Sequence, residues 1–158
     1  MTHTKEDKMG HRGESWVIMQ VALLTLFLVV PRIGAAWPSP DMFRLAGWAF
    51  VVTGILLMAW SAHNLGRSLT PFPHPRPQGQ LVTNGAYRFV RHPMYFAILI
   101  GGLGWALVTF SPLRLVLVPA LFIFFDLKAR REEIWLQEQY PDYASYKSRV
   151  KKLVPWIY

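Results

Sequence analysis

The chain has 158 residues, the length of one domain, and carries a net charge of +8 with no cysteine. Charged residues make up only 16% of the chain and apolar residues 53%, whereas soluble domains carry about 25% charged residues. Uncharged runs over residues 15–31, 45–66 and 93–113 approach or reach the length that crosses a bilayer as a helix. This pattern excludes a water-soluble enzyme with a parallel-sheet cofactor domain, a disordered chain and a disulfide scaffold. It predicts an all-α, polytopic integral membrane protein.

The first half of the chain predicts a polar tail followed by two membrane helices. Residues 1–15 form the tail, and the first helix covers residues 16–33. We interpret this helix as retained rather than as a cleaved signal peptide, because Pro31 interrupts the place where small residues would mark a cleavage site. The second helix is expected over residues 43–65, so helices one and two together occupy residues 16–65.

A proline-rich loop over residues 66–92 separates these helices from the rest of the chain. Its alternating prolines exclude a helix or a central strand and favour an extended backbone; they are Pro71, Pro73, Pro75 and Pro77.

The second half predicts a helical hairpin and a surface segment, which together cover residues 93–158. The third helix begins at Pro93, and Ser111 starts a tight turn into the fourth, over residues 113–127. The fourth uncharged stretch is short, and Arg114 could lengthen the span by extending its side chain to the membrane surface. A charged helical extension continues to about Gln139. After it, alternating aromatic and basic residues predict an interfacial C-terminal segment, which completes a single domain of about four transmembrane helices.

Basic residues predict the orientation of these helices in the membrane. With both termini and the 66–92 loop on one side, fourteen Lys and Arg residues lie on that side and three, Arg32, Arg44 and Arg114, lie on the other. The positive-inside rule then places both termini, the loop and any site between them in the cytoplasm, in a cell or inner membrane.

Polar functional groups gather before the third helix and after the fourth. Because only a few residues join these helices, their two distant ends must be neighbours. Tyr87, Arg91, His92 and Tyr95 are therefore expected to face a second group, Lys128, Glu132 and Glu133, across a pocket.

Each of these residues also has a purely structural interpretation. Arg88 and Arg91 could anchor the topology, the tyrosines could belong to an interfacial belt, and His92 could be a surface residue. Glu132 and Glu133 could form a solvated helix face that pairs with Lys128. Histidine spacing fits no metal motif, so no metal is predicted.

The order of residues resembles the isoprenylcysteine carboxyl methyltransferase family, which is related to the membrane phospholipid methyltransferases. The resemblance lies in Leu-Val-Thr-x-Gly-x-Tyr-Arg-x-x-Arg-His-Pro-x-Tyr over residues 81–95, followed by Arg-Glu-Glu-x-x-Leu over 131–136 and Tyr-Pro-x-Tyr-x-x-Tyr over 140–146. It covers residues 81–158, with Leu-Gly-Arg-Ser at 65–68 as weaker support.

This resemblance implies a methyltransferase that uses S-adenosylmethionine and has no Rossmann domain. Carried over by motif, the cofactor-binding residues are Gln80, Leu81, Val82, Tyr87, His92, Pro93, Met94, Tyr95 and Glu132. A carboxylate can bind the ammonium group of the cofactor, tyrosine rings can face its cations, and the imidazole can hold its carboxylate.

The resemblance also implies a cation that positions the acceptor four residues before the cofactor glutamate. Eukaryotic members have arginine at that position. This chain has Lys128 there, with Arg130 and Arg131 close by. The expected acceptor is a lipophilic or small amphiphilic molecule, or a lipidated one, that enters from the bilayer; carboxyl O-methylation of an isoprenylcysteine-like substrate is favoured. N-methylation of a phospholipid and S-methylation of a thiol fit the same pocket.

Two other functions remain open from the sequence. A sterol-type membrane reductase that uses NADPH would need a cluster of cations for the cofactor phosphate, which Arg88, Arg91, Arg130 and Arg131 could supply. A non-enzymatic membrane scaffold would use the polar clusters only as anchors. A nucleic-acid partner is not predicted, because the basic residues are spread over three segments as the topology requires.

Overall fold

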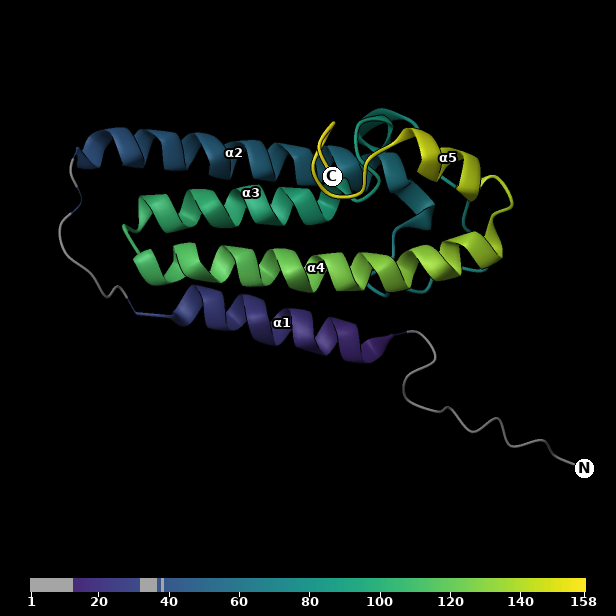
Figure 1. Cartoon of the computed structure of the whole chain (residues 1–158), viewed down its shortest axis with the longest axis horizontal. Coiled ribbons are helices and arrows are strands. Elements are labelled where there is room, and N and C mark those ends of the chain that lie inside the picture. Colours follow the sequence, from purple (N-terminus) through teal and green to yellow (C-terminus); the bar gives the residue numbers. More distant parts are fainter. Residues whose placement is uncertain (1–12, 32–36, 38) are drawn as a thin grey trace, which may run out of the picture.

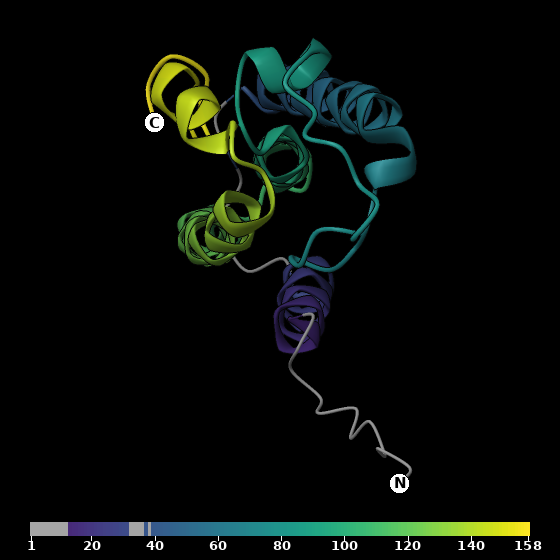
Figure 2. The same ribbon diagram turned by 90° about the vertical axis from the view of Figure 1, so that its right-hand side faces the viewer.

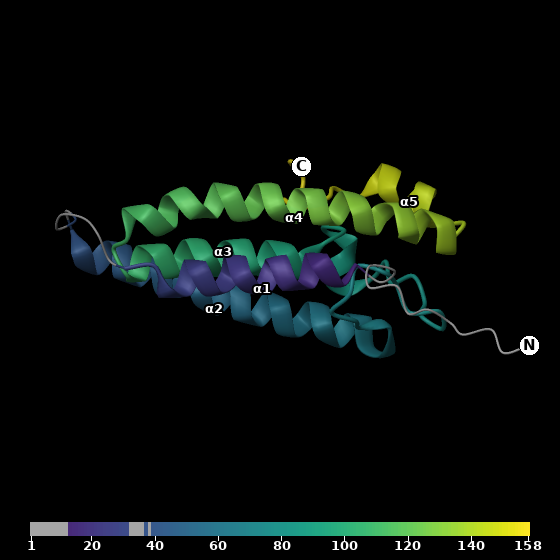
Figure 3. The same cartoon turned by 90° about the horizontal axis from the view of Figure 1, so that it is seen from below.

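A computed structural model describes residues 13–31, 37 and 39–158 of the chain. The predicted tail and its basic residues at positions 5, 8 and 12 lie outside the described residues, as does position 32. Seven helical elements follow one another: α1 (Glu14–Val29), α2 (Pro40–Leu65), η1 (Gly66–Ser68), η2 (Gly85–Arg88), α3 (Pro93–Val108), α4 (Pro112–Gln139) and α5 (Tyr143–Arg149). The four long helices lie side by side along the long axis of the molecule (Figures 1 and 3). The all-α prediction is confirmed for the described part of the chain.

The helices differ in how well each could cross a membrane alone. Residues 40–68 form a helical segment that is long and apolar enough to cross a membrane, with a mean hydropathy of 1.8. No other helix among the described residues is both long enough and apolar enough. The helices α1 and α3 are apolar but have only 16 residues each. α4 is continuous over 28 residues and ends at Gln139, as the charged extension predicted. Four complete spans therefore remain a prediction.

Close backbone approach joins α2 to α3. A Cβ atom added to Gly47 would lie 2.8 Å from the carbonyl oxygen of Gly104, and one added to Gly54 would lie 2.8 Å from that of Ala97. Small residues at these positions let two apolar helices pack backbone to backbone.

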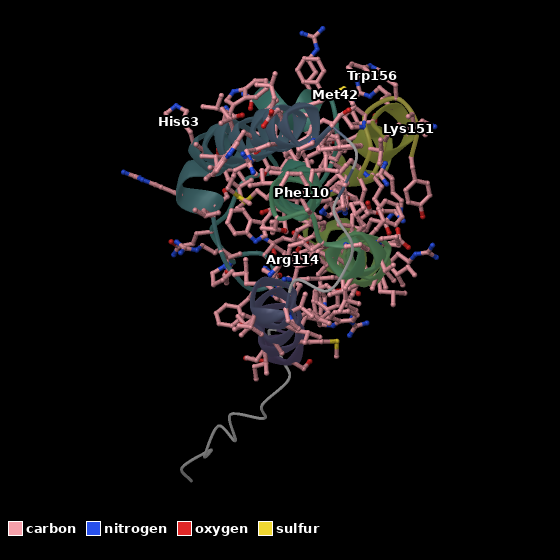
Figure 4. The ribbon with its side chains drawn as sticks, turned by 90° about the vertical axis from the view of Figure 1, so that its left-hand side faces the viewer. Met42, His63, Phe110, Arg114, Lys151 and Trp156 are labelled. Atoms are coloured by element: carbon pink, nitrogen blue, oxygen red, sulfur yellow. The ribbon has the colours of Figure 1, made fainter. Side chains whose placement is uncertain are left out.

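Arg114 fastens α1 to the start of α4. Its guanidinium donates hydrogen bonds to the carbonyl oxygens of Phe27 (3.0 Å), Leu28 (3.0 Å) and Val30 (2.7 Å), the last turn and C-cap of α1 (Figure 4). These carbonyls have no partner within the helix, and Arg114 satisfies them. The interpretation that Arg114 extends to the membrane surface is wrong, because its side chain is buried in this cap.

The C-terminal segment packs beside the start of α3. The backbone N–H of Arg91 donates to the carbonyl of Lys151 (2.8 Å) and that of His92 to the carbonyl of Lys152 (3.0 Å). Figure 2 shows α5 and the chain end beside the bundle. The apolar core is built from α1, α3 and α4, and its buried residues are Phe27, Leu99, Leu121, Phe124 and Phe125.

Candidate functional site

A cavity of about 420 Å³ opens at the end of the bundle where α2 ends and α3 begins. This volume lies within the range of about 300–1,000 Å³ that is typical of small-molecule sites. Residues from α1, α2, the proline-rich loop, α3, α4 and α5 line it. Ten residues of the sequence-predicted site are among them: Gln80, Leu81, Val82, Tyr87, Arg91, His92, Met94, Tyr95, Lys128 and Glu132.

His92, Tyr95 and Glu132 meet in the wall of this cavity. His92 precedes α3 as its N-cap residue, and Pro93 starts the helix, so the next turn brings the Tyr95 ring parallel to the imidazole at 5.3 Å. The Tyr95 hydroxyl donates to Oε2 of Glu132 (2.7 Å), and Nδ1 of His92 lies 3.7 Å from the same oxygen. The hairpin thus brings both polar clusters together.

Glu133 is a buried centre of ion pairs directly behind this wall. One carboxylate oxygen lies 2.8 Å from Nε of Arg91 and 3.3 Å from Nε2 of His92, and the other lies 3.1 Å from Nζ of Lys147. Burial alone would raise the pKa of Glu133, but the hydrogen bonds and charges of His92 and Arg91 outweigh it and hold the pKa well below its ordinary value of 4.5. The interpretation of Glu133 as a solvated helix residue is wrong, since its side chain is only 3% exposed.

Lys128 places a buried ammonium at the cavity. The residue is 2% exposed, its Nζ donates to Oε1 of Gln20 on α1, and it lies 5.4 Å from the centre of the Tyr95 ring. Burial lowers the pKa of Lys128, and the charge of Glu132 offsets this only in part. Within the described chain, no carboxylate forms an ion pair with Lys128. Its positive charge is therefore available to pair with an anionic group of a ligand.

Three tyrosines close the cavity on the side of α5 and η2. Tyr146 donates a hydrogen bond to the carbonyl of Tyr87 (2.6 Å), which ties α5 to η2. Burial, followed by the charge of Glu132, raises the pKa of Tyr87, so its ring stays neutral. Tyr143 also lines the cavity, and its hydroxyl is buried with no hydrogen-bond partner among the described residues.

The proline-rich loop supplies backbone groups to the opposite wall. Oγ of Ser68 pairs with the backbone of Gln80, accepting from its N–H at 3.0 Å and donating to its carbonyl at 3.3 Å. Asn64 at the end of α2 accepts from the backbone N–H of Ala86 (2.9 Å). These contacts fix Leu81 and Val82 between two anchored points on the cavity wall.

Some predicted site residues lie elsewhere. Pro93 is buried at the start of α3 but does not line the cavity. Arg131 lies on the outer face of α4, 4.6 Å from the ring of Trp135. The arginines considered for a cofactor phosphate do not gather at the cavity, because of those four only Arg91 lines it.

Sequence reasoning missed Gln20, Met58 and Tyr143, which also line the cavity. Gln20 is an amide within an apolar helix, and that feature could have drawn attention to it. In the part of the chain that the structure describes, no group of three or more His, Cys, Asp or Glu residues is arranged to hold a metal ion.

Known proteins resemble this chain over most of its length. The family model described as phospholipid methyltransferase matches residues 42–143. A probable protein-S-isoprenylcysteine O-methyltransferase of Oryza sativa subsp. indica is 29% identical over 138 residues, which cover 85% of this chain and 70% of that protein. The cobalt-zinc-cadmium resistance protein CzcN of Cupriavidus metallidurans is 29% identical over 149 residues, 92% of this chain and 64% of that protein. Methanethiol S-methyltransferase 1 of Bradyrhizobium diazoefficiens is 30% identical over 121 residues, 70% of this chain and 39% of that protein.

Proposed function

The chain belongs to the phospholipid methyltransferase family, and from this premise we propose that it is an integral membrane enzyme that transfers a methyl group from S-adenosylmethionine to a lipophilic or small amphiphilic acceptor. The observation that carries the proposal is the meeting of Glu132, Tyr95 and His92 in the wall of a cavity of about 420 Å³. A structural anchor would not need a carboxylate held by a tyrosine hydroxyl beside a ligand-sized cavity.

The residues present fit the chemistry of the cofactor. Glu132 offers a carboxylate for its ammonium group, His92 offers a hydrogen-bond donor for its carboxylate, and the backbone of Leu81 and Val82 can bind its polar edges. The neutral rings of Tyr87 and Tyr95 can face its cationic groups.

When bound, the cofactor supplies an activated methyl group on a sulfonium. The protein therefore has to position the two reactants and exclude water, and covalent catalysis by a side chain is not required. The tyrosines of α5 and η2 cover the cavity on one side, and the proline-rich loop covers it on the other.

Lys128 is proposed to position the acceptor, because it is a buried cation at the cavity with no carboxylate partner among the described residues. An acidic group would be attracted to it, which supports carboxyl O-methylation ahead of N-methylation of an amine. A thiolate is attracted by the same charge, so S-methylation remains the alternative. Arg131 is not assigned this role, since it lies over Trp135 outside the cavity.

The proposal includes four membrane-crossing helices with both termini and the cavity on the cytoplasmic side. Its support is the distribution of basic residues along the sequence and the antiparallel arrangement of α3 and α4, which lie side by side along the bundle (Figure 1).

Calorimetric titration of the detergent-solubilised chain with S-adenosylhomocysteine tests the proposal. The unaltered chain is expected to bind, and Glu132→Gln is expected to weaken binding by about tenfold or more, because a hydrogen bond to a charged group contributes about 1.5–3 kcal/mol. Glu138→Gln is the matched control, an exposed glutamate farther along α4, and should leave the affinity unchanged. Absence of binding by the unaltered chain, or equal affinity in the Glu132 variant, would contradict the proposal.

A further inference from the structure

A shallow, open depression lies between α4, α5 and the C-terminal segment, separated from the first cavity by the Glu133 ion pairs. Its lining is predominantly basic: Arg91, Arg130, Glu133, Ile134, Lys147 and Lys152. We call it the basic pocket. Nothing in the proposed methyl transfer uses it.

The basic pocket carries more positive charge than its own carboxylates neutralise. Two carboxylates serve four cations: Glu133 pairs with Arg91 (2.8 Å) and Lys147 (3.1 Å), and Asp126 pairs with Arg130 (2.7 Å) and Lys152 (2.6 Å). The side chains of Arg130 and Lys147 are 62% and 39% exposed, so both can reach a ligand. An excess of two positive charges in a concave site is complementary to an anion such as a phosphate.

An apolar stripe on α4 leads directly to this pocket. Val116, Ile123, Leu127 and Ile134 are exposed, and Arg130 is exposed between the last two. These positions are spaced at 7, 4, 3 and 4 residues in the sequence, so they share one face of the helix. The stripe is long enough to lie along an acyl chain, and Arg130 places a cation near its polar end.

Exposed aromatic rings lie on α2, on the segment before α3 and on the C-terminal segment. Phe89 lies 6.2 Å from the ring of Trp60 and 6.3 Å from that of Trp156, and Tyr158 lies 5.9 Å from that of Phe122. Trp156 projects at the edge of the molecule (Figure 4). Trp60, Trp156 and Tyr158 are exposed, and exposed tryptophan and tyrosine rings are typical of the boundary between hydrocarbon and headgroups.

We propose that the basic pocket binds the phosphate of an anionic phospholipid whose acyl chain lies along the α4 stripe. Arg130 and Lys147 are the side chains that contact the phosphate, and the headgroup bridges α4 to α5. The lipid would thereby hold α5 and the C-terminal segment against the bundle. This site depends on the chain being in a membrane and is independent of methyl transfer.

Native mass spectrometry of the whole chain in detergent, incubated with equal amounts of dioleoyl phosphatidylglycerol and dioleoyl phosphatidylcholine, tests this site. The unaltered chain is expected to retain the anionic lipid roughly tenfold more than the zwitterionic one, because each basic residue near a lipid surface contributes about 1 kcal/mol. Arg130→Gln combined with Lys147→Gln should remove that preference and leave retention of phosphatidylcholine unchanged.

The double variant Arg44→Gln, Arg67→Gln is the matched control, because it removes the same charge from exposed arginines outside the cavity and the basic pocket. It should keep the preference for phosphatidylglycerol. Equal retention of the two lipids by the unaltered chain overturns the proposal without any variant, and so does an equal loss in both double variants. If excess inorganic phosphate displaces phosphatidylglycerol completely, the pocket takes a free anion, and the lipid assignment is wrong.

Discussion

Lys128 is a buried cation at the cavity, so it is expected to lower the stability of the fold and to interact with a ligand. Its ammonium is buried against Gln20 and the Tyr95 ring without a carboxylate partner in the described chain. A buried charge without an ion pair destabilises the folded state, and the charge of Glu132 offsets the burial of Lys128 only in part. Residues that are retained despite such a cost commonly serve function, because stability and activity are traded against each other at active sites.

Replacing Lys128 with methionine is therefore expected to stabilise the protein and to impair its reaction. Lys128→Met should raise the free energy of unfolding by roughly 1 kcal/mol, because an apolar side chain of similar length replaces the buried charge. Thermal unfolding in detergent measures the stability. Transfer of labelled methyl groups to a membrane extract measures the activity, which should fall. Lys128→Arg is the control that keeps the charge. Unchanged activity in the methionine variant would contradict a functional role for the cation, and a loss of stability would contradict the cost of its burial.

The pairing of His92 with Glu132 could be predicted from the sequence, whereas the part played by Glu133 could not. A short turn between two antiparallel helices brings their distant ends together whatever their packing. Which of two adjacent glutamates faces the cavity depends on the rotation of α4, since neighbouring residues on a helix point about 100° apart. That rotation is fixed by α5 and the segment before α3, whose Lys147 and Arg91 pair with Glu133.

The interface between α2 and α3 gives a test at the level of secondary-structure elements. A Cβ atom on Gly104 would lie 2.7 Å from the backbone nitrogen of Val51, whereas one on Gly101 would meet nothing within 4 Å. Gly104→Ala is expected to destabilise the protein by about 1–3 kcal/mol, because neither backbone can move away without loss of packing. Gly101→Ala on the same helix should be neutral or slightly stabilising, since alanine favours helix.

Thermal or denaturant unfolding of the two alanine variants in one detergent measures this difference. Equal stability of both variants would show that the α2–α3 contact is not as close as the structure describes.

The sequence predicts most of the helices and their bounds. It does not predict the contacts that the helix ends make with distant segments. Pro93 starts α3 as expected, whereas α4 begins at Pro112, one residue before its expected start. The helical extension ends at Gln139, two residues before Pro141. The first helix ends at Val29, four residues before the expected end at residue 33. The bridge between Val90 and Lys151 joins segments far apart in sequence, and local patterns contain no signal for such a pairing.

At the scale of the whole molecule, Glu133 makes stability depend on pH. Its folded pKa lies below its unfolded value of 4.5, so the ionised carboxylate stabilises the fold fully above pH 4.5 and progressively less as the pH falls below that value. The unfolding temperature in detergent is expected to decrease between pH 6 and pH 3.5. Glu133→Gln should flatten this decrease, whereas the exposed Glu138→Gln should not. A constant unfolding temperature of the unaltered chain over this range would contradict the assignment.

The composition of the chain predicts a membrane protein, but it does not predict how many of its helices cross the membrane. Long uncharged runs predict apolar helices, because a bilayer accommodates such runs as helices whose backbone groups are all hydrogen-bonded. Only residues 40–68 meet the criterion for a span among the described residues, because α1 and α3 are shorter and α4 carries its charged extension within the same helix. The number of crossings depends on how neighbouring helices and lipids accommodate these shorter segments.

The burial of Arg114 changes how the charges of this chain are counted for orientation. Statistical rules for membrane insertion treat each arginine as a group that stays in water or among lipid phosphates. The guanidinium of Arg114 instead donates hydrogen bonds to peptide carbonyl oxygens at the end of α1, and its side chain is buried in the protein interior. Leaving it out of the tally reduces the minority side from three basic residues to two and sharpens the asymmetry in the sequence. An arginine close to a turn between two apolar helices can thus serve a neighbouring helix rather than mark a side of the membrane.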